Sequence, residues 1–336
     1  MLTKVYLKLK QFMKENYKSI IILILLYFTL TYPLPYYIYA GGGTINIDNR
    51  IVLKNKTTTK GSLNFAYVKE LKGNVASFLL GKLIPSYDIE KEETEKMNKD
   101  ETAEDILFRN QIYLENANQT AIMLAYQKAN KEITIKKKHF YIIYVDNKKE
   151  NDLRVGDEII SVNGNSVREV TDYTNIVKNS NINDTLTIKV KRNNHLKEVR
   201  AKVKEKDGTK ITGIVVSTIY EYETNPKIKL KFKSSEGGPS GGLMLTLAIY
   251  NKLTDSNLSN GRKIVGTGTI DQNGNVGEIG GVKYKLNGAV KDHADIFLVP
   301  SGDNYKEALK EKEKNNYQIT IKAIKTLDEA ITYLKE

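Results

Sequence analysis

The stretch Glu236-Gly237-Gly238-Pro239-Ser240-Gly241-Gly242 decides how the C-terminal part of the chain folds. Before it, apolar side chains alternate with lysines, which predicts a half-buried strand over residues 227–233. After it, a continuous apolar run predicts a buried helix over residues 242–253. Ser240 therefore lies on a glycine-rich turn between a strand and a helix. The N-terminus of that helix would direct N–H groups at charge developing beside the serine, which is how an oxyanion hole is made.

A serine hydroxyl is a poor nucleophile until a neighbouring base takes its proton. The sequence has only three histidines, and none of them stands in a catalytic motif: His139, His195 and His293. A lysine can serve as the base if burial lowers its pKa from about 10.4 toward 7–8. Lys283 follows two glycines and opens an amphipathic segment that leads into an apolar strand at residues 296–299. Lys283 is therefore the candidate base.

Three further motifs follow Ser240 in a fixed order: Gly266-Thr267-Gly268-Thr269-Ile270, then Gly277-Glu278-Ile279-Gly280-Gly281-Val282-Lys283, then Phe297-Leu298-Val299-Pro300. Their order and spacing closely resemble the proteolytic domain of Lon-type serine proteases over residues 206–336. The resemblance implies that Ser240 is the nucleophile, Lys283 the general base and Thr267 the hydroxyl that orients the lysine amine. N–H groups from Gly238 to Gly241 would hold the oxyanion. The chain departs from the pattern at Gly237, where Lon proteases usually carry an acidic residue.

Two other interpretations stay open. Gly238-x-Ser240-x-Gly242 also fits the nucleophile elbow of α/β-hydrolases, with Asp271 or Asp292 and His293 as partners in an esterase. Fewer than about a hundred residues follow the serine, which is short for that fold. The chain could instead be a non-catalytic adaptor of the cell envelope, in which the protease-like part is only a scaffold.

Residues 132–205 change to a pattern of short strands. Strands are predicted over residues 140–145, 158–162 and 185–190, with a helix over residues 170–178. The stretch from Leu153 to Gly164 (LRVGDEIISVNG) strongly resembles the core of PDZ domains. That resemblance implies binding of an extended peptide as an added strand. Where glycines would bind the peptide end, the sequence has Lys136-Lys137-Lys138-His139-Phe140, and a plain spacer role is the alternative.

The N-terminus predicts a membrane anchor. Residues 1–18 carry five lysines against Glu15, and residues 19–39 are uncharged and rich in Ile, Leu and Tyr. A helix over residues 19–39 would be about 31 Å long, close to the thickness of the hydrocarbon core. The lysines would keep the N-terminus in the cytoplasm and place residues 41 onward outside it. A cleaved signal peptide ending near Ala40 is the alternative.

Between the anchor and the PDZ-like segment, residues 41–131 predict strands over 44–70, a short helix at 77–83 and a long helix over 103–129. This layout resembles the segment that precedes the PDZ domain in membrane-anchored Lon-like proteases of Gram-positive bacteria. The chain has no cysteine, so disulfides and thiol chemistry are excluded. Its net charge of +12 is spread along the chain without an aromatic-interleaved basic motif, which argues against nucleic acid as a partner.

We therefore expect an α+β multidomain protein with four parts: an anchor at residues 1–40, a membrane-proximal segment at 41–131, a PDZ-like domain at 132–205 and a Lon-like α/β proteolytic domain at 206–336. No phosphate-binding loop occurs in the sequence, so we expect an ATP-independent serine endopeptidase. We expect no cofactor and no metal. Exported peptides or membrane-proximal proteins would be the substrates, and the resemblance to ring-forming Lon domains implies that the chain can form a homo-oligomer.

Overall fold

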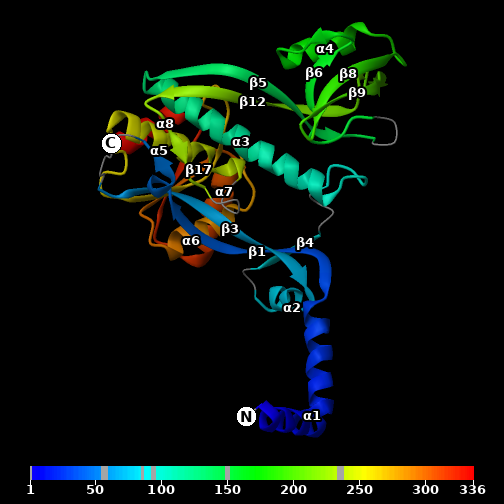
Figure 1. The fold of residues 1–336 in the computed structure, drawn as a ribbon. Coiled ribbons are helices and arrows are strands. Elements are labelled where there is room, and N and C mark those ends of the chain that lie inside the picture. The colour runs from blue at the N-terminus through cyan, green and yellow to red at the C-terminus, as the bar shows by residue number, and fades with distance from the viewer. Residues whose placement is uncertain (1, 54–59, 85–86, 92–95, 148–151, 233–237) are drawn as a thin grey trace. The chain divides into compact units, whose positions relative to one another are not determined.

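The computed structural model describes residues 2–53, 60–84, 87–91, 96–147, 152–232 and 238–336 (Figure 1). The chain divides into two compact units. The N-terminal unit comprises Met1–Gly41 and Val68–Glu95, and the main unit comprises Gly42–Tyr67 and Lys96–Glu336. Two long strands, β1 (Pro33–Asn46) and β3 (Ser62–Asn74), each belong partly to one unit and partly to the other.

The N-terminal unit consists of helix α1 (Leu2–Thr31), one part each of β1 and β3, helix α2 (Val75–Leu83) and strand β4 (Asp88–Lys91). β4 pairs with β1 in antiparallel fashion, with Ile38 opposite Ile89. α2 begins with a capping box in which Asn74 and Ser77 exchange hydrogen bonds, so two of the donors at the helix start are satisfied. The predicted short helix near residue 77 is confirmed.

The prediction of a membrane-spanning helix over residues 19–39 is wrong. α1 ends at Thr31 and β1 starts at Pro33, because proline lacks the N–H group that a helix needs. Residues 36–39 instead pair with β4. The uncharged part of α1, residues 19–31, rises only about 20 Å. Among the residues that the structure describes, no helix combines the length and the apolar character that a membrane crossing requires.

The main unit contains a mostly parallel sheet. Its strands lie in the order β18, β17, β14, β3 and β1, and β14 is parallel to both β17 and β3. Apart from β1 and β3, which are given above, and the β region, which is described below, the main unit contains η1 (Asp48–Arg50), β2 (Ile51–Val52), α3 (Ala103–Lys128), β13 (Lys229–Leu230), η3 (Pro239–Gly241), α5 (Gly242–Thr254), β14 (Lys263–Gly266), β15 (Thr269–Ile270), β16 (Val276–Gly277), α6 (Val282–Lys291), β17 (Ile296–Pro300), α7 (Asp303–Asn315), β18 (Thr320–Ile324) and α8 (Leu327–Lys335).

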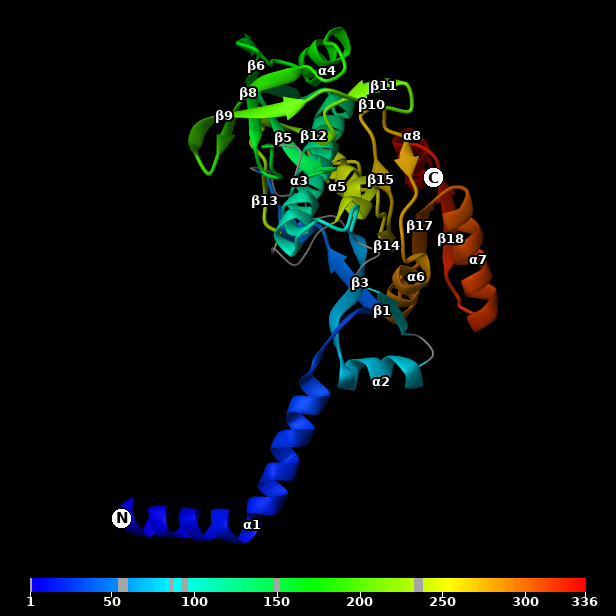
Figure 2. The same cartoon turned by 90° about the vertical axis from the view of Figure 1, so that its right-hand side faces the viewer.

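Helices cover both faces of this sheet. Side chains alternate between the faces along each strand, so Ile264 and Leu298 join a core with α3, α5 and α8. Val265 and Phe297 point the other way, into a core with α6 and α7. Figure 2 shows the sheet with α3 and α5 on one side and α6 and α7 on the other. The result is the three-layer arrangement expected for a parallel sheet.

The helix expected directly after Ser240 is present as α5. Helix α8 begins at Leu327, and the Thr326 side chain caps it by accepting a hydrogen bond from the N–H of Glu329. The strand predicted over residues 227–233 is much shorter, because only Lys229–Leu230 pair, with β2. Residue 233 lies outside the described residues, as do Glu236 and Gly237. The sheet also takes a strand from the predicted membrane-proximal segment, since Phe65 of β3 pairs with Gly266 of β14.

A second sheet, which we call the β region (residues 132–225), is inserted between α3 and the serine turn. Its elements are β5 (Glu132–Val145), β6 (Glu158–Val162), β7 (Asn165–Ser166), α4 (Val170–Asn179), β8 (Thr185–Arg192), β9 (His195–Lys202), β10 (Lys204–Lys206), β11 (Thr209–Ile211) and β12 (Ile214–Asn225). The sheet order is β12, β5, β6, β8 and β9. The three predicted strands and the predicted helix of this region are confirmed.

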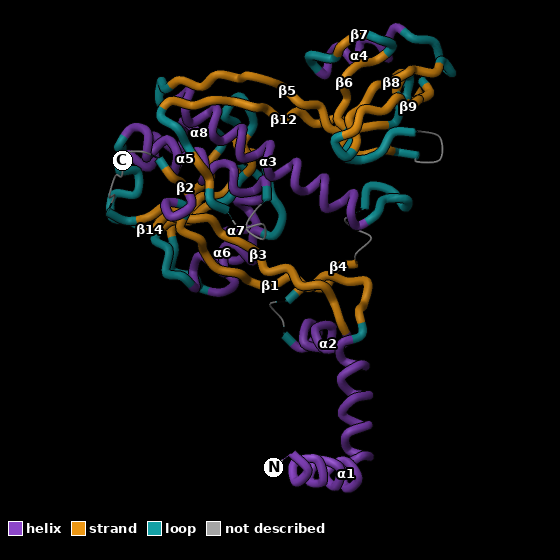
Figure 3. Tube along the Cα trace, in the orientation of Figure 1, coloured by secondary structure: helices purple, strands orange, loops and turns teal. Residues whose placement is uncertain are grey.

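β5 and β12 pair along their whole length and form one long antiparallel ribbon (Figure 3). Its first half carries residues 136–138, the lysines that we placed in a peptide-end-binding loop. They lie inside strand β5 and face β12, with Lys138 opposite Tyr220. The prediction of a loop there is wrong, because alternating residues from Ile133 onward extend the strand beyond the apolar run.

The turn before β6 is fixed by a buried carboxylate. Asp157 is fully buried and accepts two hydrogen bonds from Arg192, at 2.7 Å from Nε and 2.7 Å from Nη2. The Asp157 carboxylate also raises the pKa of Arg192, chiefly by its hydrogen bonds. Loss of one partner of such a buried ion pair destabilises a protein, because the other charge stays buried without compensation. The pair therefore holds the turn and β8 together.

Candidate active site

Ser240 lies in the short helical turn η3, directly before α5. Gly238 has φ 157° and ψ 149°, a backbone conformation that residues with a side chain rarely adopt. The glycine after the serine is also required, because a Cβ at Gly241 would lie 2.7 Å from Cε1 of Phe65. The turn is therefore packed tightly against β3. Phe65 was not among the predicted site residues, since nothing in its local sequence points to the serine.

The carbonyl of Ser240 is held by two donors from the end of β14. The N–H of Gly268 donates to it at 2.7 Å, and the hydroxyl of Thr267 donates to it at 3.1 Å. Thr267 is buried, and its own N–H donates to the carbonyl of Leu298. The structure thus brings Thr267 next to Ser240, whereas the sequence predicted that Thr267 orients the amine of Lys283. The Thr267 proton, however, is used to hold the backbone of the serine.

Two amides of the turn are already engaged within it. The N–H of Gly241 donates to the carbonyl of Gly238 at 3.3 Å, and the N–H of Gly242 donates to that of Pro239. Proline has no N–H at all. Of the amides expected from Gly238 to Gly241, those of Gly238 and Ser240 therefore stay candidates for oxyanion donors, and we choose the N–H of Ser240 because it lies on the same residue as the proposed nucleophile.

Lys283 is the second residue of α6 and is half-buried. Gly281, the N-cap residue, adopts a left-handed conformation with φ 71° and ψ 33°, which reverses the chain into the helix. The backbone N–H of Lys283 donates to Glu307 of α7 at 3.3 Å. Its amine lies 4.9 Å from the centroid of the Tyr284 ring, a cation–π distance.

The loop before Lys283 is fixed by an asparagine that the sequence did not reveal. Asn304 of α7 is buried, accepts from the N–H of Ile279 at 2.7 Å and donates to its carbonyl at 3.0 Å. On the far side, α6 packs closely on β1, since a Cβ at Gly288 would lie 3.0 Å from the nitrogen of Gly43. The start of α6 is therefore held between α7 and β1.

Lys285 is a second lysine of α6 with base-like properties. It is only 5% exposed, and burial lowers its pKa to about 8. On a helix it points about 200° away from Lys283 and shares a face with Gly288 and Ala289. One pattern in the sequence points to Lys285, which continues the apolar face that Val282 and Leu286 border. Lys285 is thus a competitor for the role of the base.

The acids required for the esterase interpretation are engaged elsewhere. Asp292 accepts from the N–H and the hydroxyl of Thr44 at 2.7 and 2.8 Å. Asp271 accepts from Asn273 and Asn275 in its own turn, and the bond from the Asn275 side chain lowers its pKa most. Both carboxylates therefore stabilise local structure, and neither geometry favours a partnership with His293.

The outer edge of β12 is the candidate peptide-binding edge of the β region. Its first residues border α4, where the hydroxyls of Tyr173 and Thr212 are hydrogen-bonded. Farther along, side chains of α3 cover the edge: Asn116 donates to the carbonyl of Thr218, and Gln119 both donates to and accepts from the backbone of Tyr220. Strand alternation makes Val216 the next residue whose N–H and carbonyl point to that edge.

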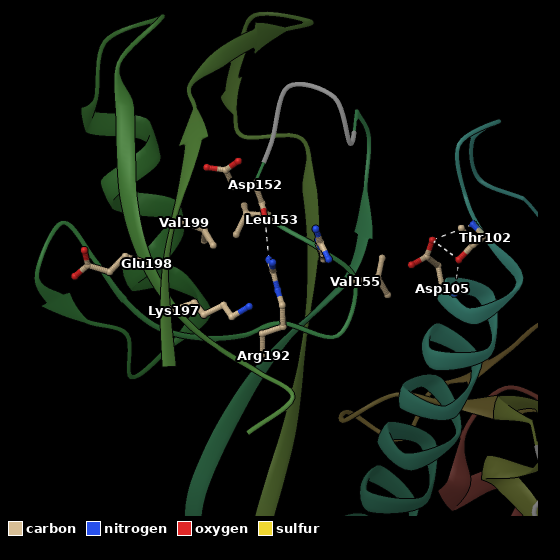
Figure 4. Close-up of a pocket in the computed structure, with 10 residues that line it drawn as sticks. Thr102, Asp105, Asp152, Leu153, Val155, Arg192, Lys197, Glu198 and Val199 are labelled. Atoms are coloured by element: carbon tan, nitrogen blue, oxygen red, sulfur yellow. Dashed lines mark hydrogen bonds between the residues drawn. The ribbon is translucent and has the colours of Figure 1, made fainter. Parts of the chain in front are cut away.

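An open pocket of about 710 Å³ lies elsewhere in the main unit, beside the buried Asp157. Figure 4 shows Arg192 reaching from β8 toward the backbone of Asp152, to which it donates at 2.7 Å. Ser240, Thr267 and Lys283 are not among its lining residues, which are Thr102, Asp105, Asp152, Leu153, Arg154, Val155, Arg192, Lys197, Glu198 and Val199. Since Arg192 is used to neutralise Asp157, we interpret this pocket as structural.

Comparison with known proteins identifies two domains. The family model of the PDZ domain matches residues 108–203, and that of the Lon protease (S16) C-terminal proteolytic domain matches residues 233–335. No curated protein matches the chain. Among solved structures, the PDZ domain of an SdrC-like protein from Listeria monocytogenes is 21% identical, with a TM-score of 0.22, over 25% of this chain and 92% of that one. The second domain of a Listeria protein is 23% identical, with a TM-score of 0.20, over 26% and 88%.

Replacing Lys285 by Met should raise the stability of the protein at pH 7. With a pKa of about 8 when folded and about 10.4 when unfolded, the unfolded chain binds more protons between these values. Lys285 therefore makes the wild-type free energy of unfolding rise as the pH increases from about 8 to 10.4, by on the order of 3 kcal/mol. Below pH 8 the full cost of burying the charge is present, and Lys285→Met removes it.

The measurement is denaturant unfolding at pH 7 and pH 10 for the wild type, Lys285→Met and the control Lys291→Met, which changes an exposed lysine of the same helix. The control should keep the wild-type rise in stability between the two pH values. An equal rise in Lys285→Met would show that the buried amine does not titrate in this range.

Proposed function

We propose that this chain, a PDZ-containing Lon-like protease, is an ATP-independent serine endopeptidase that uses Ser240 as nucleophile and Lys283 as general base. The observation that carries the proposal is the fixed serine turn. Ser240 lies on a glycine-rich turn, and its carbonyl accepts hydrogen bonds from Gly268 and Thr267. The turn lies within the region that matches the Lon proteolytic domain. The start of α6, which carries Lys283, is fixed in the same region by Asn304.

The proposed reaction is acyl transfer through a covalent intermediate. The neutral amine of Lys283 takes the proton of the Ser240 hydroxyl, whose oxygen attacks the peptide carbonyl carbon. The N–H of Ser240 donates to the oxyanion that forms. Lys283 then gives its proton to the leaving amine as the C–N bond breaks. A water molecule, deprotonated by the same lysine, attacks the carbonyl carbon of the acyl-enzyme. The ester bond to the Ser240 oxygen then breaks, that oxygen takes the proton back from Lys283, and the second product leaves with a free carboxyl group.

Thr267 has two compatible roles in this mechanism. Its proton goes to the carbonyl of Ser240, which keeps the serine backbone in place. A hydroxyl oxygen can also accept hydrogen bonds while it donates one. We therefore assign to Thr267 the acceptor that orients the amine of Lys283 toward the serine. We prefer Lys283 over Lys285 as the base because Lys283 occupies the lysine position of the Lon motif after Gly280-Gly281.

The β region would select substrates by binding a peptide along the first residues of β12. Main-chain hydrogen bonds give affinity in this mode, and neighbouring pockets give selectivity. Asn116 and Gln119 occupy the edge from Thr218 onward, so an added strand would be short. Because the sequence contains no phosphate-binding loop, the substrates would be flexible: exported peptides or exposed loops.

We further propose that the apolar half of α1 attaches the protein to a membrane and that the other domains lie outside the cytoplasm. Residues 21–28 are uncharged, and their large apolar side chains are about half exposed or more. Five lysines precede them, against one glutamate. Such a segment favours contact with an anionic lipid surface. Self-association through the Lon-like domain is a further proposal from the resemblance alone.

Ser240→Ala should abolish the cleavage of unstructured peptides, because it removes the hydroxyl that is proposed as the nucleophile. His293→Ala should leave the cleavage rate within about twofold of wild type. The measurement is cleavage of a pool of synthetic decapeptides, followed by mass spectrometry, with unfolding curves to show that both variants fold. Loss of activity in His293→Ala alone would favour the esterase-type mechanism, and full activity in Ser240→Ala would exclude Ser240 as the nucleophile.

Val216→Pro should weaken peptide binding by about fivefold, because proline removes one N–H of the β12 edge and a hydrogen bond is worth about 1 kcal/mol. The matched control Val216→Ala shortens the side chain but keeps the N–H. Binding is measured by fluorescence anisotropy of labelled decapeptides to proteins that also carry Ser240→Ala. Each peptide is used with a free and with an amidated C-terminus, which separates end capture from internal binding. Equal affinities of Val216→Pro and Val216→Ala would contradict binding at this edge.

A further inference from the structure

Helix α2 carries apolar side chains on the surface of the N-terminal unit. Leu79, Leu80 and Leu83 are 52%, 52% and 77% exposed. In an α-helix these positions fall within an arc of about 100°, so they form one continuous strip. The strip is not part of the site around Ser240 or of the β12 edge, and an exposed strip of large apolar residues usually marks an interaction surface.

The opposite side of α2 is fixed to the strands of the same unit. The Phe78 ring packs against Tyr36 with centroids 5.3 Å apart. Gly81 is buried, and a Cβ there would lie 3.1 Å from Ile89 and 3.5 Å from Ile38. Because this face is committed to β1 and β4, the leucine strip is held outward and cannot turn inward by a simple rotation of the helix.

The surroundings of the strip have the chemistry of a bilayer interface. The N–H of Val75, at the start of α2, donates to the carbonyl of Tyr32 at 3.3 Å, so the strip begins beside the end of α1. Tyr32 is itself 64% exposed, and tyrosine is enriched at the level of lipid headgroups. Lys82 lies next to the strip, with its amine 5.7 Å from the Phe78 ring, where it can reach headgroups while its stem stays apolar.

The distribution of charge in the N-terminal unit also favours a lipid surface over a protein as the partner of the strip. The exposed apolar residues of α1 and the strip on α2 belong to one compact unit, and the basic start of α1 belongs to it as well. Figure 2 shows that α1 bends sharply between its N-terminal part and the part that leads to β1. The N-terminal part of α1 carries basic residues, and the part that leads to β1 carries apolar ones. This arrangement matches an anionic headgroup surface above a hydrocarbon layer.

We propose that α2 is a second membrane contact, which inserts Leu79, Leu80 and Leu83 into the interface of an anionic bilayer. The inference rests on the membrane attachment proposed for α1, but it assigns a separate surface. Two attachment points would hold the unit at a fixed depth in the membrane. A single anchor would leave it free to pivot.

The chain contains no tryptophan, so a single introduced one reports on one site. The full-length variant Leu80→Trp is mixed with vesicles of phosphatidylcholine and phosphatidylserine, and with vesicles whose lipids are brominated near the headgroup. Emission should shift to the blue on vesicle binding, and brominated lipid should quench it. The control Leu196→Trp, at an exposed site of β9, should show neither effect.

The outcomes separate the two membrane proposals. Co-sedimentation of Leu80→Trp with vesicles without a blue shift would retain the attachment through α1 and overturn the insertion of α2. A failure to co-sediment would overturn both. A blue shift that appears without vesicles and grows with protein concentration would show that a second copy covers the strip, which would also overturn the proposal.

Discussion

The position of Ser240 depends on one pair of hydrogen bonds, those that its carbonyl accepts from Gly268 and Thr267. Both donors follow directly on β14, a central strand of the parallel sheet. These two hydrogen bonds connect the backbone of Ser240 to the sheet, so the sheet holds the serine in place through its carbonyl group. Glycines at positions 241 and 242 are needed for the same reason, since Phe65 and Ile270 lie where a Cβ would stand.

The same constraint explains why the β region can be inserted without disturbing the serine. α3 and the ribbon of β5 and β12 enter and leave the insertion side by side, and Asn116 and Gln119 tie the helix to β12. In the chain, the serine turn follows β12 and β13. A peptide bound at the free end of β12, as proposed, would lie on a strand that precedes Ser240. This order would give the proposed selection of substrates by the PDZ domain a physical basis.

Local patterns were sufficient for much of this structure. The apolar run after Ser240 predicted α5, and the pattern of short strands predicted β6 with the correct ends. Ser240 and Thr267 were selected as site residues because each lies in a contiguous motif, but the hydrogen bond from Thr267 to the carbonyl of Ser240 was not predicted. Long-range relations were not predictable. Phe65 reaches the turn through pairing of β3 with β14, and Asn304 reaches the loop before Lys283 from a helix that follows it.

Two errors have a common physical cause. The uncharged stretch at residues 19–39 and the lysines at 136–138 were judged by composition, whereas residues 36–39 and 136–138 lie in strands whose partners come from elsewhere in the chain. Burial is likewise a property of the fold. Lys283 was expected to be the buried lysine, yet Lys285 is the one whose pKa burial lowers to about 8. The proposed activation of Ser240 by Lys283 is therefore the central claim to test.

The most direct measurement is the rate at which a peptidyl fluorophosphonate modifies Ser240, followed across pH by mass spectrometry of the digested protein. If Lys283 is the base, the wild type should be modified at Ser240 at a rate that rises as the amine loses its proton. Lys285→Met should be modified at a similar rate, and Lys283→Met should be slower on the order of 100-fold. Modification of Lys283→Met at the wild-type rate would contradict the proposed mechanism.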